Sequence, residues 1–213
     1  MELESRFSKD EIAAAVGRVA DEVSADYQNE VPLLVGILTG SFIFLADLVR
    51  AMSVPVEIDF IRARSYGKGT VSSGAVEITK DIEHDVTGRS VVLVEDILDT
   101  GLTLDFVADR VRAGHPREVK ACSLLVREGA APPDYMGLWI PQGFVVGYGI
   151  DYAERYRGSS EFATGSRLFG AWRRASAQFE PGDEYDLVGD QCQEDCLVLA
   201  HVEPLICSGR SRL

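Results

Sequence analysis

The segment from Val92 to Thr103 constrains the fold of this chain more than any other part of its sequence. Three apolar residues run directly into two adjacent carboxylates, Glu95 and Asp96, and an Asp-Thr-Gly-x-Thr turn begins three residues after Asp96. An apolar run that ends in a Thr-Gly turn predicts a buried strand, a tight turn and a helix, which is the repeating unit of an α/β sheet. Ligands of such sheets bind at the carboxyl ends of the strands, so the acids and the turn form a candidate site.

The residue types in this segment suit a sugar that carries a phosphate. Two neighbouring carboxylates accept hydrogen bonds from adjacent sugar hydroxyls, and the turn offers backbone N–H groups, threonine hydroxyls and a helix N-terminus to a phosphate. Gly101 lets the backbone approach the anion and adopt a positive φ. The alternative is an ordinary turn in which Asp99 or Thr100 only caps the helix. That alternative leaves the pairing of Glu95 with Asp96 unexplained.

The rest of the chain alternates between helix and strand patterns. We predict helices over residues 8–26, 41–51 and 103–112, and strands over 33–38, 56–63, 75–78, 90–94, 119–126 and 144–147. The first helix begins at a capping box, Ser8-Lys-Asp-Glu11. A stretch rich in Gly, Ser and Thr, residues 65–74, predicts a loop. The alternation favours a mostly parallel sheet with helices on both faces.

Composition narrows the class of protein. The 213 residues are 46% hydrophobic and 26% charged, as expected for one globular α/β domain. No apolar run approaches the roughly 20 residues of a membrane span, and residues 1–10 lack the apolar core of a signal peptide. We therefore expect a cytoplasmic location without membrane association. The net charge of −13 argues against broad nucleic-acid binding. With this charge, a polyanionic substrate requires local cations, and we expect Mg²⁺ with a few Arg and Lys.

Five segments occur in an order that resembles a known family: Gly36-Ile-Leu-Thr-Gly-Ser41, Asp59-Phe-Ile-Arg-Ala-Arg-Ser-Tyr66, Glu95 to Thr103, Ser123-Leu-Leu-Val-Arg127 and Phe144-Val-Val-Gly-Tyr-Gly-Ile-Asp-Tyr152. Together they resemble the hypoxanthine-guanine phosphoribosyltransferases, purine salvage enzymes of the type I phosphoribosyltransferase family. The resemblance covers about residues 8–157. It implies a mostly parallel sheet flanked by helices, with a small hood. It also implies an enzyme that uses Mg²⁺ to transfer phosphoribose from phosphoribosyl pyrophosphate (PRPP) to N9 of a 6-oxopurine, giving IMP or GMP and pyrophosphate.

The resemblance implies a role for each matching residue. Glu95 and Asp96 would hold the ribose hydroxyls of PRPP, partly through Mg²⁺, and Asp99 would act as a general base beside the purine N7. The other implied positions are Thr100, Gly101, Leu102 and Thr103 around the 5′-phosphate, Thr39, Gly40 and Arg157 at the pyrophosphate, Arg127, Phe144 and Val145 at the purine, Asp151 at a second Mg²⁺, and Ser65 and Tyr66 in a lid.

Two positions depart from the pattern of the family. Thr39 stands where many members have a lysine, so pyrophosphate binding relies more on backbone N–H groups. Arg127 stands where the family usually has a lysine that donates to the purine 6-oxo group. Arginine also donates, but its planar fork has a different reach. The preference among hypoxanthine, guanine and xanthine therefore stays open.

Residues 1–157 are predicted to form the phosphoribosyltransferase domain, and residues 158–213 an unmatched extension. Cys192, Cys196 and Cys207 lie in this extension, where free thiols are favoured over a disulfide or metal site. The resemblance further implies a homodimer or homotetramer. Two alternatives share the fold: a regulatory protein that senses PRPP or nucleotides, and a member that binds nucleotide without turnover.

Overall fold

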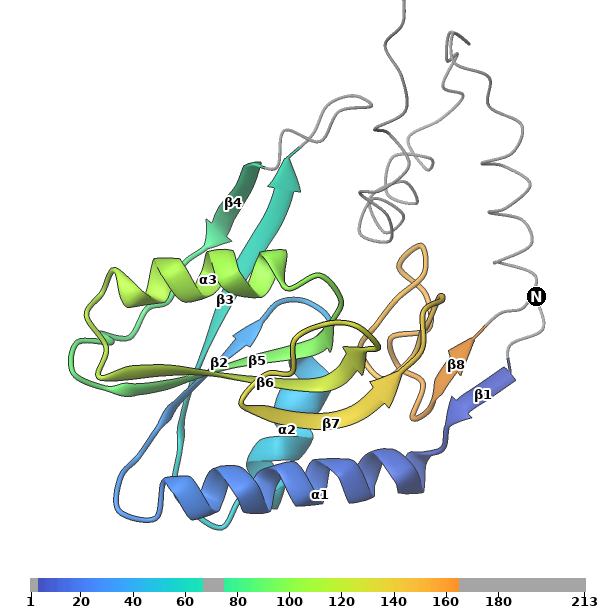
Figure 1. The fold of residues 1–213 in the computed structure, drawn as a ribbon, viewed down its shortest axis with the longest axis horizontal. Helices are drawn as coiled ribbons and strands as arrows, with labels where there is room; N and C mark the ends of the chain where they lie inside the picture. Colours follow the sequence, from blue (N-terminus) through green and yellow to red (C-terminus); the bar gives the residue numbers. More distant parts are fainter. Residues whose placement is uncertain (1–3, 67–74, 165–213) are drawn as a thin grey trace, which may run out of the picture.

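A six-stranded sheet forms the centre of the protein in the computed structural model, which describes residues 4–66 and 75–164 (Figure 1). Five strands run parallel and one edge strand, β4, runs antiparallel, in the order β4-β3-β2-β5-β6-β7. This arrangement confirms the predicted mostly parallel α/β sheet. The strands are β2 Leu33–Ile37, β3 Glu57–Tyr66, β4 Ala75–Lys80, β5 Ser90–Leu98, β6 Glu118–Arg127 and β7 Tyr135–Ile140.

The helices of the described ranges are α1 Lys9–Asp26, α2 Phe42–Ala51 and α3 Leu102–Arg112. α1 and α2 cover one face of the sheet and α3 covers the other (Figure 1). α1 begins at the predicted capping box, in which the Ser8 hydroxyl accepts from the Glu11 N–H and the Glu11 carboxylate accepts from the Ser8 N–H. Within residues 4–66 and 75–164, no helix is long and apolar enough to cross a membrane.

Alternate residues of the buried strands build two hydrophobic cores, because successive side chains of a strand point to opposite faces. Leu34 and Val92 pack with residues of α1 and α2, whereas Leu33 and Val91 pack with residues of α3. Burial on both faces explains why these strands are continuous apolar runs instead of alternating patterns. The two cores hold the strands rigidly, and the loops at their carboxyl ends are positioned by that rigid frame.

Two parts of the chain differ from the predicted elements. The strand β7 was not predicted, and Gly137 interrupts its apolar pattern. A Cβ at Gly137 would lie 2.4 Å from the Leu124 carbonyl oxygen, so glycine lets β7 lie close to β6. The predicted strand over residues 144–147 is wrong. Positive φ angles at Gly147 and Tyr148 turn the backbone, and the segment makes only isolated bridges.

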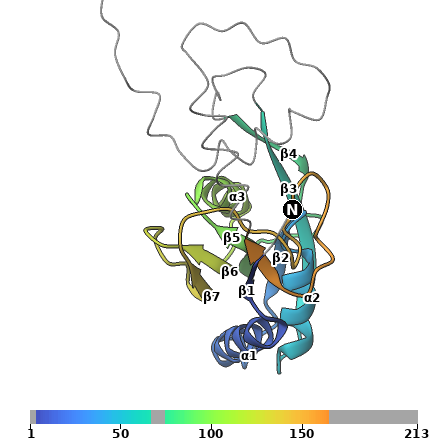
Figure 2. The same ribbon diagram turned by 90° about the vertical axis from the view of Figure 1, so that its right-hand side faces the viewer.

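A small second sheet of β1 Glu4–Phe7 and β8 Phe162–Thr164 forms a hood beside the main sheet (Figures 1 and 2). Its antiparallel pairing brings the two ends of the described chain together. Ala163 bridges Val146, and the fully buried ring of Phe162 packs against Tyr148. The hood therefore supports the segment that follows β7. β8 lies beyond residue 157, the predicted boundary of the N-terminal domain.

The strand β3 leaves the parallel sheet halfway along its length. Residues 57–61 pair with β2, whereas residues 62–66 pair with β4, so the β3–β4 hairpin projects past the other strands (Figure 2). Ser65 and Tyr66 were predicted to begin a loop, but their backbones continue β3 and pair with β4. The remainder of that predicted loop, residues 67–74, lies outside the described residues.

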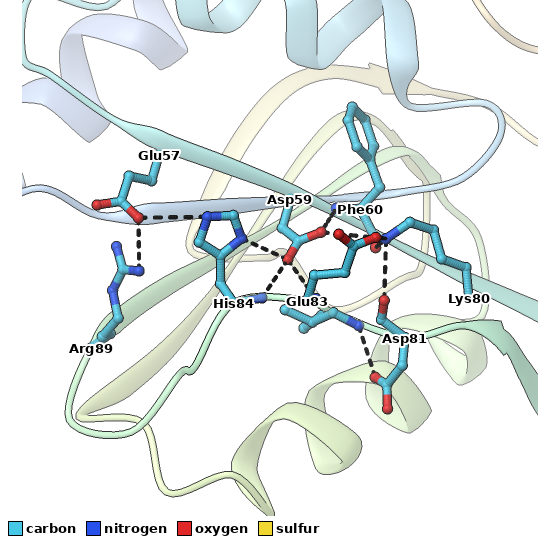
Figure 3. Close-up of polar contacts among 9 residues, drawn as sticks. Glu57, Asp59, Phe60, Lys80, Asp81, Glu83, His84 and Arg89 are labelled. Atoms are coloured by element: carbon cyan, nitrogen blue, oxygen red, sulfur yellow. Dashed lines mark hydrogen bonds and ion pairs between the residues drawn. The ribbon is translucent and has the colours of Figure 1, made fainter.

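Asp59 fastens the connection between β4 and β5 to β3 (Figure 3). Asp59 is 6% exposed, and its Oδ2 accepts from the backbone N–H groups of Glu83 and His84 at 2.7 and 2.9 Å. The His84 Nδ1 lies 2.8 Å from the same oxygen, and the Lys80 ammonium lies 3.5 Å from Oδ1. Burial alone would raise the pKa of Asp59, but the hydrogen bonds from His84 and from backbone N–H groups outweigh burial and lower the pKa below 3.8.

Replacing Asp59 with asparagine is expected to lower the free energy of unfolding by about 2–3 kcal/mol at pH 7, because buried donors lose a charged acceptor. The pKa of Asp59 is lower in the folded state, so the wild-type advantage is complete above the unfolded pKa of about 4 and is lost as the pH falls toward the folded pKa. Urea unfolding at pH 7 and pH 3 measures both effects. The control is Asp109→Asn, a change at an exposed side chain of α3. It is expected to change the free energy of unfolding by less than about 0.5 kcal/mol. Equal stability of wild type and Asp59→Asn at pH 7 would contradict this role.

Candidate active site

The carboxyl ends of β2 and β5 are neighbours, although the chain forms β3 and β4 between them. The chain leaves β2 toward one edge of the sheet and returns on the other side of β2, which makes this position the topological switch point. The loop after β2 contains Thr39 and Gly40, the end of β5 carries Glu95 and Asp96, and the adjacent β6 ends at Arg127. The structure thus brings these predicted segments to one edge of the sheet.

The turn between β5 and α3 leads directly into the helix N-terminus. Gly101 has a φ of 82° and precedes Leu102, the first helical residue. The Gly101 carbonyl accepts the first helical hydrogen bond, from the Asp105 N–H at 2.8 Å. The N–H groups of the first turn lack intrahelical acceptors. Thr100 is exposed and Thr103 is half-buried, so the turn carries hydroxyl and N–H donors of the kind that can bind a phosphate.

Glu95 and Asp96 lie within β5, because the strand extends to Leu98, beyond its predicted end. Asp96 is 8% exposed, and its Oδ1 accepts from the Ile97 N–H at 3.0 Å. Burial raises the pKa of Glu95 well above its ordinary value, and the charge of Asp96 raises it further. Burial also raises the pKa of Asp96, although its hydrogen bonds and the charge of Arg157 oppose that change. Because burial and mutual repulsion disfavour two ionised carboxylates here, hydroxyl donors and cations that stabilise the ionised forms are favoured as ligands.

The loop after β2 packs tightly against the acid pair. The peptide bond between Leu38 and Thr39 is cis. A Cβ at Gly40 would lie 1.7 Å from the Asp96 Oδ2, so a side chain has no room between the loop and the carboxylate. A Cβ at Gly149 would lie 2.0 Å from the Gly40 carbonyl oxygen. The loop is therefore enclosed between β5 and the segment that follows β7.

Asp99 and Arg127 face each other across the ends of β5 and β6. The Arg127 Nε lies 3.9 Å from the Asp99 Oδ1, and the Arg127 Nη1 donates to the Pro141 carbonyl at 2.7 Å. Burial lowers the pKa of Arg127, and the charge of Asp99 opposes that change. A guanidinium has five N–H donors, so Arg127 keeps donors for a ligand. The pair sets a carboxylate and a cation side by side at the site.

The segment after Pro141 carries the predicted purine-binding residues Phe144 and Val145. The Phe144 ring is partly buried and contacts the Tyr152 ring edge to face, with centroids 5.3 Å apart. The Val145 side chain is buried in the core, so its backbone is the part available to a ligand. The hydrogen bond from Arg127 to Pro141 ties this segment to the end of β6.

Asp151 and Arg157, predicted to bind a metal and pyrophosphate, form an ion pair with each other. The Arg157 Nη2 lies 2.5 Å from the Asp151 Oδ1, and its Nη1 donates to the Gly149 carbonyl at 2.9 Å. The Asp151 Oδ2 accepts from the Glu154 N–H at 2.9 Å. Arg157 therefore lies beside the glycine that touches the loop after β2.

The carboxylates predicted to hold Mg²⁺ do not form a closed cage. Within the described part of the chain, no group of three or more His, Cys, Asp or Glu side chains is arranged to hold a metal ion. Mg²⁺ commonly takes one or two protein carboxylates and completes its octahedral shell with water and substrate phosphates. Glu95 and Asp96 fit this use, because they are adjacent oxygen ligands whose ionised forms are disfavoured by burial and would be stabilised by a cation.

Two residues at this site were not predicted to contribute to it. Tyr148 and Gly149 follow Gly147, and all three have positive φ angles. The Gly-Tyr-Gly triplet signals an unusual backbone in the sequence, but nothing local indicates that Gly149 contacts Gly40. That contact joins segments about a hundred residues apart, and only the fold creates it.

Several known proteins have sequences similar to that of this chain. The chain matches the phosphoribosyl transferase domain family over residues 7–153. It is 41% identical over 154 residues to the hypoxanthine-guanine phosphoribosyltransferase of Bacillus subtilis, which covers 70% of this chain and 86% of that protein. It is also 41% identical over 157 residues to the hypoxanthine phosphoribosyltransferase of Haemophilus influenzae, covering 70% of this chain and 88% of that protein.

A longer relative and a solved structure extend the comparison. The chain is 43% identical over 154 residues to the bifunctional TilS/HprT protein of Listeria innocua, covering 70% of this chain but 24% of that protein, about a quarter of its length. A crystal structure of a hypoxanthine-guanine phosphoribosyltransferase from Bacillus anthracis matches with a TM-score of 0.73 and 39% identity, covering 77% of this chain and 99% of that one. The chain belongs to the phosphoribosyltransferase family, in the branch of the hypoxanthine-guanine phosphoribosyltransferases.

Proposed function

We propose that this protein is a purine salvage enzyme that transfers the 5-phosphoribosyl group of PRPP to N9 of hypoxanthine or guanine, giving IMP or GMP and pyrophosphate. One observation carries the proposal: three groups lie together at the switch point of the sheet. They are the acid pair of β5, the turn before α3 and the Asp99–Arg127 pair. These three groups suit the ribose hydroxyls, the 5′-phosphate and the purine ring, respectively. Family membership supports the same assignment.

The chemistry explains the charges of the site. The reaction breaks the bond between C1′ and pyrophosphate and forms a bond between C1′ and the purine N9. Positive charge develops on the ribose and negative charge on the leaving group. Glu95 and Asp96 bind the ribose hydroxyls and favour the cation-like ribose electrostatically. Arg157 and the backbone N–H groups at Thr39 and Gly40 bind the departing pyrophosphate.

The purine is oriented by the groups at the ends of β5 and β6. Asp99 faces the purine N7. It accepts the proton that the imidazole ring of the purine loses as N9 forms its bond to C1′. Arg127 donates to the 6-oxo oxygen through a donor that is not used by Pro141. Phe144 stacks on the ring, and the Val145 backbone contacts the C2 edge. An acceptor at position 6 is thus favoured over an amino group.

Bound Mg²⁺ would neutralise charge on the pyrophosphate and so favour its departure. Glu95 and Asp96 are the residues proposed to hold it with PRPP, and Asp151 is proposed to hold a second ion. The partners of this proposal are PRPP, a 6-oxopurine and a second copy of the chain, in a homodimer or homotetramer.

The test is a spectrophotometric assay with PRPP, Mg²⁺ and, in separate reactions, hypoxanthine, guanine, xanthine and adenine. Turnover is expected with hypoxanthine or guanine, and kcat/KM for adenine is expected to be at least about 100-fold lower, because its amino group meets donors instead of acceptors. The order of the 6-oxopurines then measures the effect of Arg127. A folded protein that binds PRPP in calorimetry but turns over no base would overturn the proposal and favour nucleotide sensing.

A further inference from the structure

Tyr148 occupies an unusual backbone conformation at the centre of the segment after β7. It has a φ of 48°, between Gly147 at 103° and Gly149 at 102°. Bulky residues rarely adopt positive φ, so surrounding contacts must hold this conformation. Its side chain is 6% exposed, and its ring packs against the Phe162 ring of the hood, with centroids 5.6 Å apart.

The Tyr148 hydroxyl reaches a different layer of the protein. It donates to the Asp47 Oδ2 on α2 at 2.5 Å. Burial raises the pKa of Tyr148 well above its ordinary value, so the hydroxyl keeps its proton and remains a donor. Asp47 lies in the middle of α2, the helix that begins directly after the loop containing Thr39 and Gly40. The hydrogen bond therefore connects the segment after β7 to the helix that follows this loop.

A second set of contacts runs from the same segment to the acid pair. Gly149 touches the Gly40 carbonyl, and Gly40 touches the Asp96 carboxylate, both too closely for a side chain. The Gly149 carbonyl accepts from Arg157, and the Gly149 N–H donates to the Arg157 carbonyl at 2.9 Å. Small shifts of Gly149 thus pass directly to Gly40, Asp96 and Arg157, because no flexible side chain lies between them.

We propose that Tyr148 and Asp47 form a positioning pair that holds the loop after β2 in register with Asp96 and Arg157. The hydroxyl contact fixes the segment after β7 against α2, and the glycine contacts then fix the loop between that segment and β5. The pair acts through Gly149 and Gly40 and touches neither substrate. This inference rests on the proposed function, because the aligned groups are those assigned to PRPP and its pyrophosphate.

The test begins with Tyr148→Phe, which removes only the hydroxyl. We expect kcat/KM for PRPP to fall at least about 10-fold, as loss of one hydrogen bond to a charged group allows. The KM for hypoxanthine is expected to change less than about twofold, because the hydrogen bond from Arg127 to Pro141 still anchors the start of the segment, where Phe144 lies. Asp47→Ala is expected to lower kcat/KM for PRPP by a similar factor. The double variant Tyr148→Phe/Asp47→Ala is expected to lose no more than either single variant, because the two residues form one contact. Asp47→Asn keeps a hydrogen-bond acceptor for the Tyr148 hydroxyl, so it is expected to keep most of the activity that Asp47→Ala loses.

Tyr135→Phe is the matched control. Tyr135 is also buried, and its hydroxyl donates to the Asp26 carboxylate at 2.6 Å, but it lies at the amino end of β7, away from the site. It is expected to lose similar stability and keep wild-type kinetic constants. Hydrogen exchange provides a readout independent of activity: the Tyr148 and Gly149 amides, which donate to Ser159 and Arg157, are expected to lose protection in Tyr148→Phe and not in Tyr135→Phe.

The outcomes separate the two proposals. If wild type turns over no purine, the proposed function fails, and the exchange measurement still decides whether Tyr148 holds the segment. If wild type is active and Tyr148→Phe keeps its kcat/KM for PRPP, the positioning role is wrong. If Tyr135→Phe loses as much activity as Tyr148→Phe, the loss reflects lower overall stability, and the inference is likewise wrong.

Discussion

Replacing Asp99 with asparagine is expected to lower kcat about 10²- to 10⁴-fold, the usual contribution of a positioned general base. The amide keeps the shape of the side chain but cannot accept a proton from the purine at neutral pH. Its oxygen can still contact Arg127, which lies 3.9 Å from the carboxylate in the wild type. The measurement is a comparison of kcat and of PRPP affinity in wild type and variant, by steady-state kinetics and calorimetry.

PRPP binding is expected to persist in Asp99→Asn, because the acid pair and residues 100–103, which are assigned to the 5′-phosphate, are unchanged. The control is Asp109→Asn, the same change at an exposed position on α3, which is expected to keep wild-type kcat. A wild-type kcat in Asp99→Asn would show that another group takes the proton. A parallel loss of PRPP binding would instead assign Asp99 to the sugar-phosphate end of the site.

Gly40→Ala is expected to reduce kcat/KM for PRPP by about 100-fold or more, since misplacement of reacting groups by about 1 Å has effects of this size. The added Cβ would lie 1.7 Å from the Asp96 Oδ2, so the loop or the carboxylate must move. Either movement changes the alignment of the residues assigned to ribose and pyrophosphate. Steady-state kinetics with varied PRPP measure the loss.

Gly158→Ala is the matched control for Gly40→Ala. A Cβ at Gly158 meets nothing within 4 Å, and its φ is not in the positive range, so the change is expected to leave the kinetic constants unaltered. The contradicting outcome is a Gly40→Ala protein that unfolds at the same urea concentration as wild type and keeps the wild-type kcat/KM for PRPP. It would show that the loop can shift without affecting catalysis.

The elements with the strongest local signals were predicted from the sequence. The capping box located the start of α1, and the Asp-Thr-Gly-x-Thr turn located the start of α3, because both signals act within a few residues. Strand ends were less accurate, as β5 continues through both acids and β3 continues to Tyr66. Hydrogen bonds from neighbouring strands decide those ends, and they come from distant parts of the chain.

The weakest predictions concern the segment after β6. β7 was not predicted, and a strand over residues 144–147 was predicted wrongly. The structural roles of Gly137 and of the apolar run at Val145 depend on residues that are distant in the sequence. Gly137 permits close packing of strands, whereas the apolar side chain of Val145 enters the core from an irregular segment. Local periodicity cannot distinguish these uses.

The sequence by itself determined the chemical groups of the candidate site: two adjacent acids near the end of a strand, and a third acid three residues further on that begins the turn proposed to bind a phosphate. Their spacing is covalent, so it survives any arrangement of the rest of the chain. Only the tertiary structure decided which groups face them. Arg127 opposite Asp99, Gly40 against Asp96 and Tyr148 bound to Asp47 all depend on sheet order and helix packing. Such contacts join residues far apart in the chain, and they form only when burial of the two cores brings the strands and helices together.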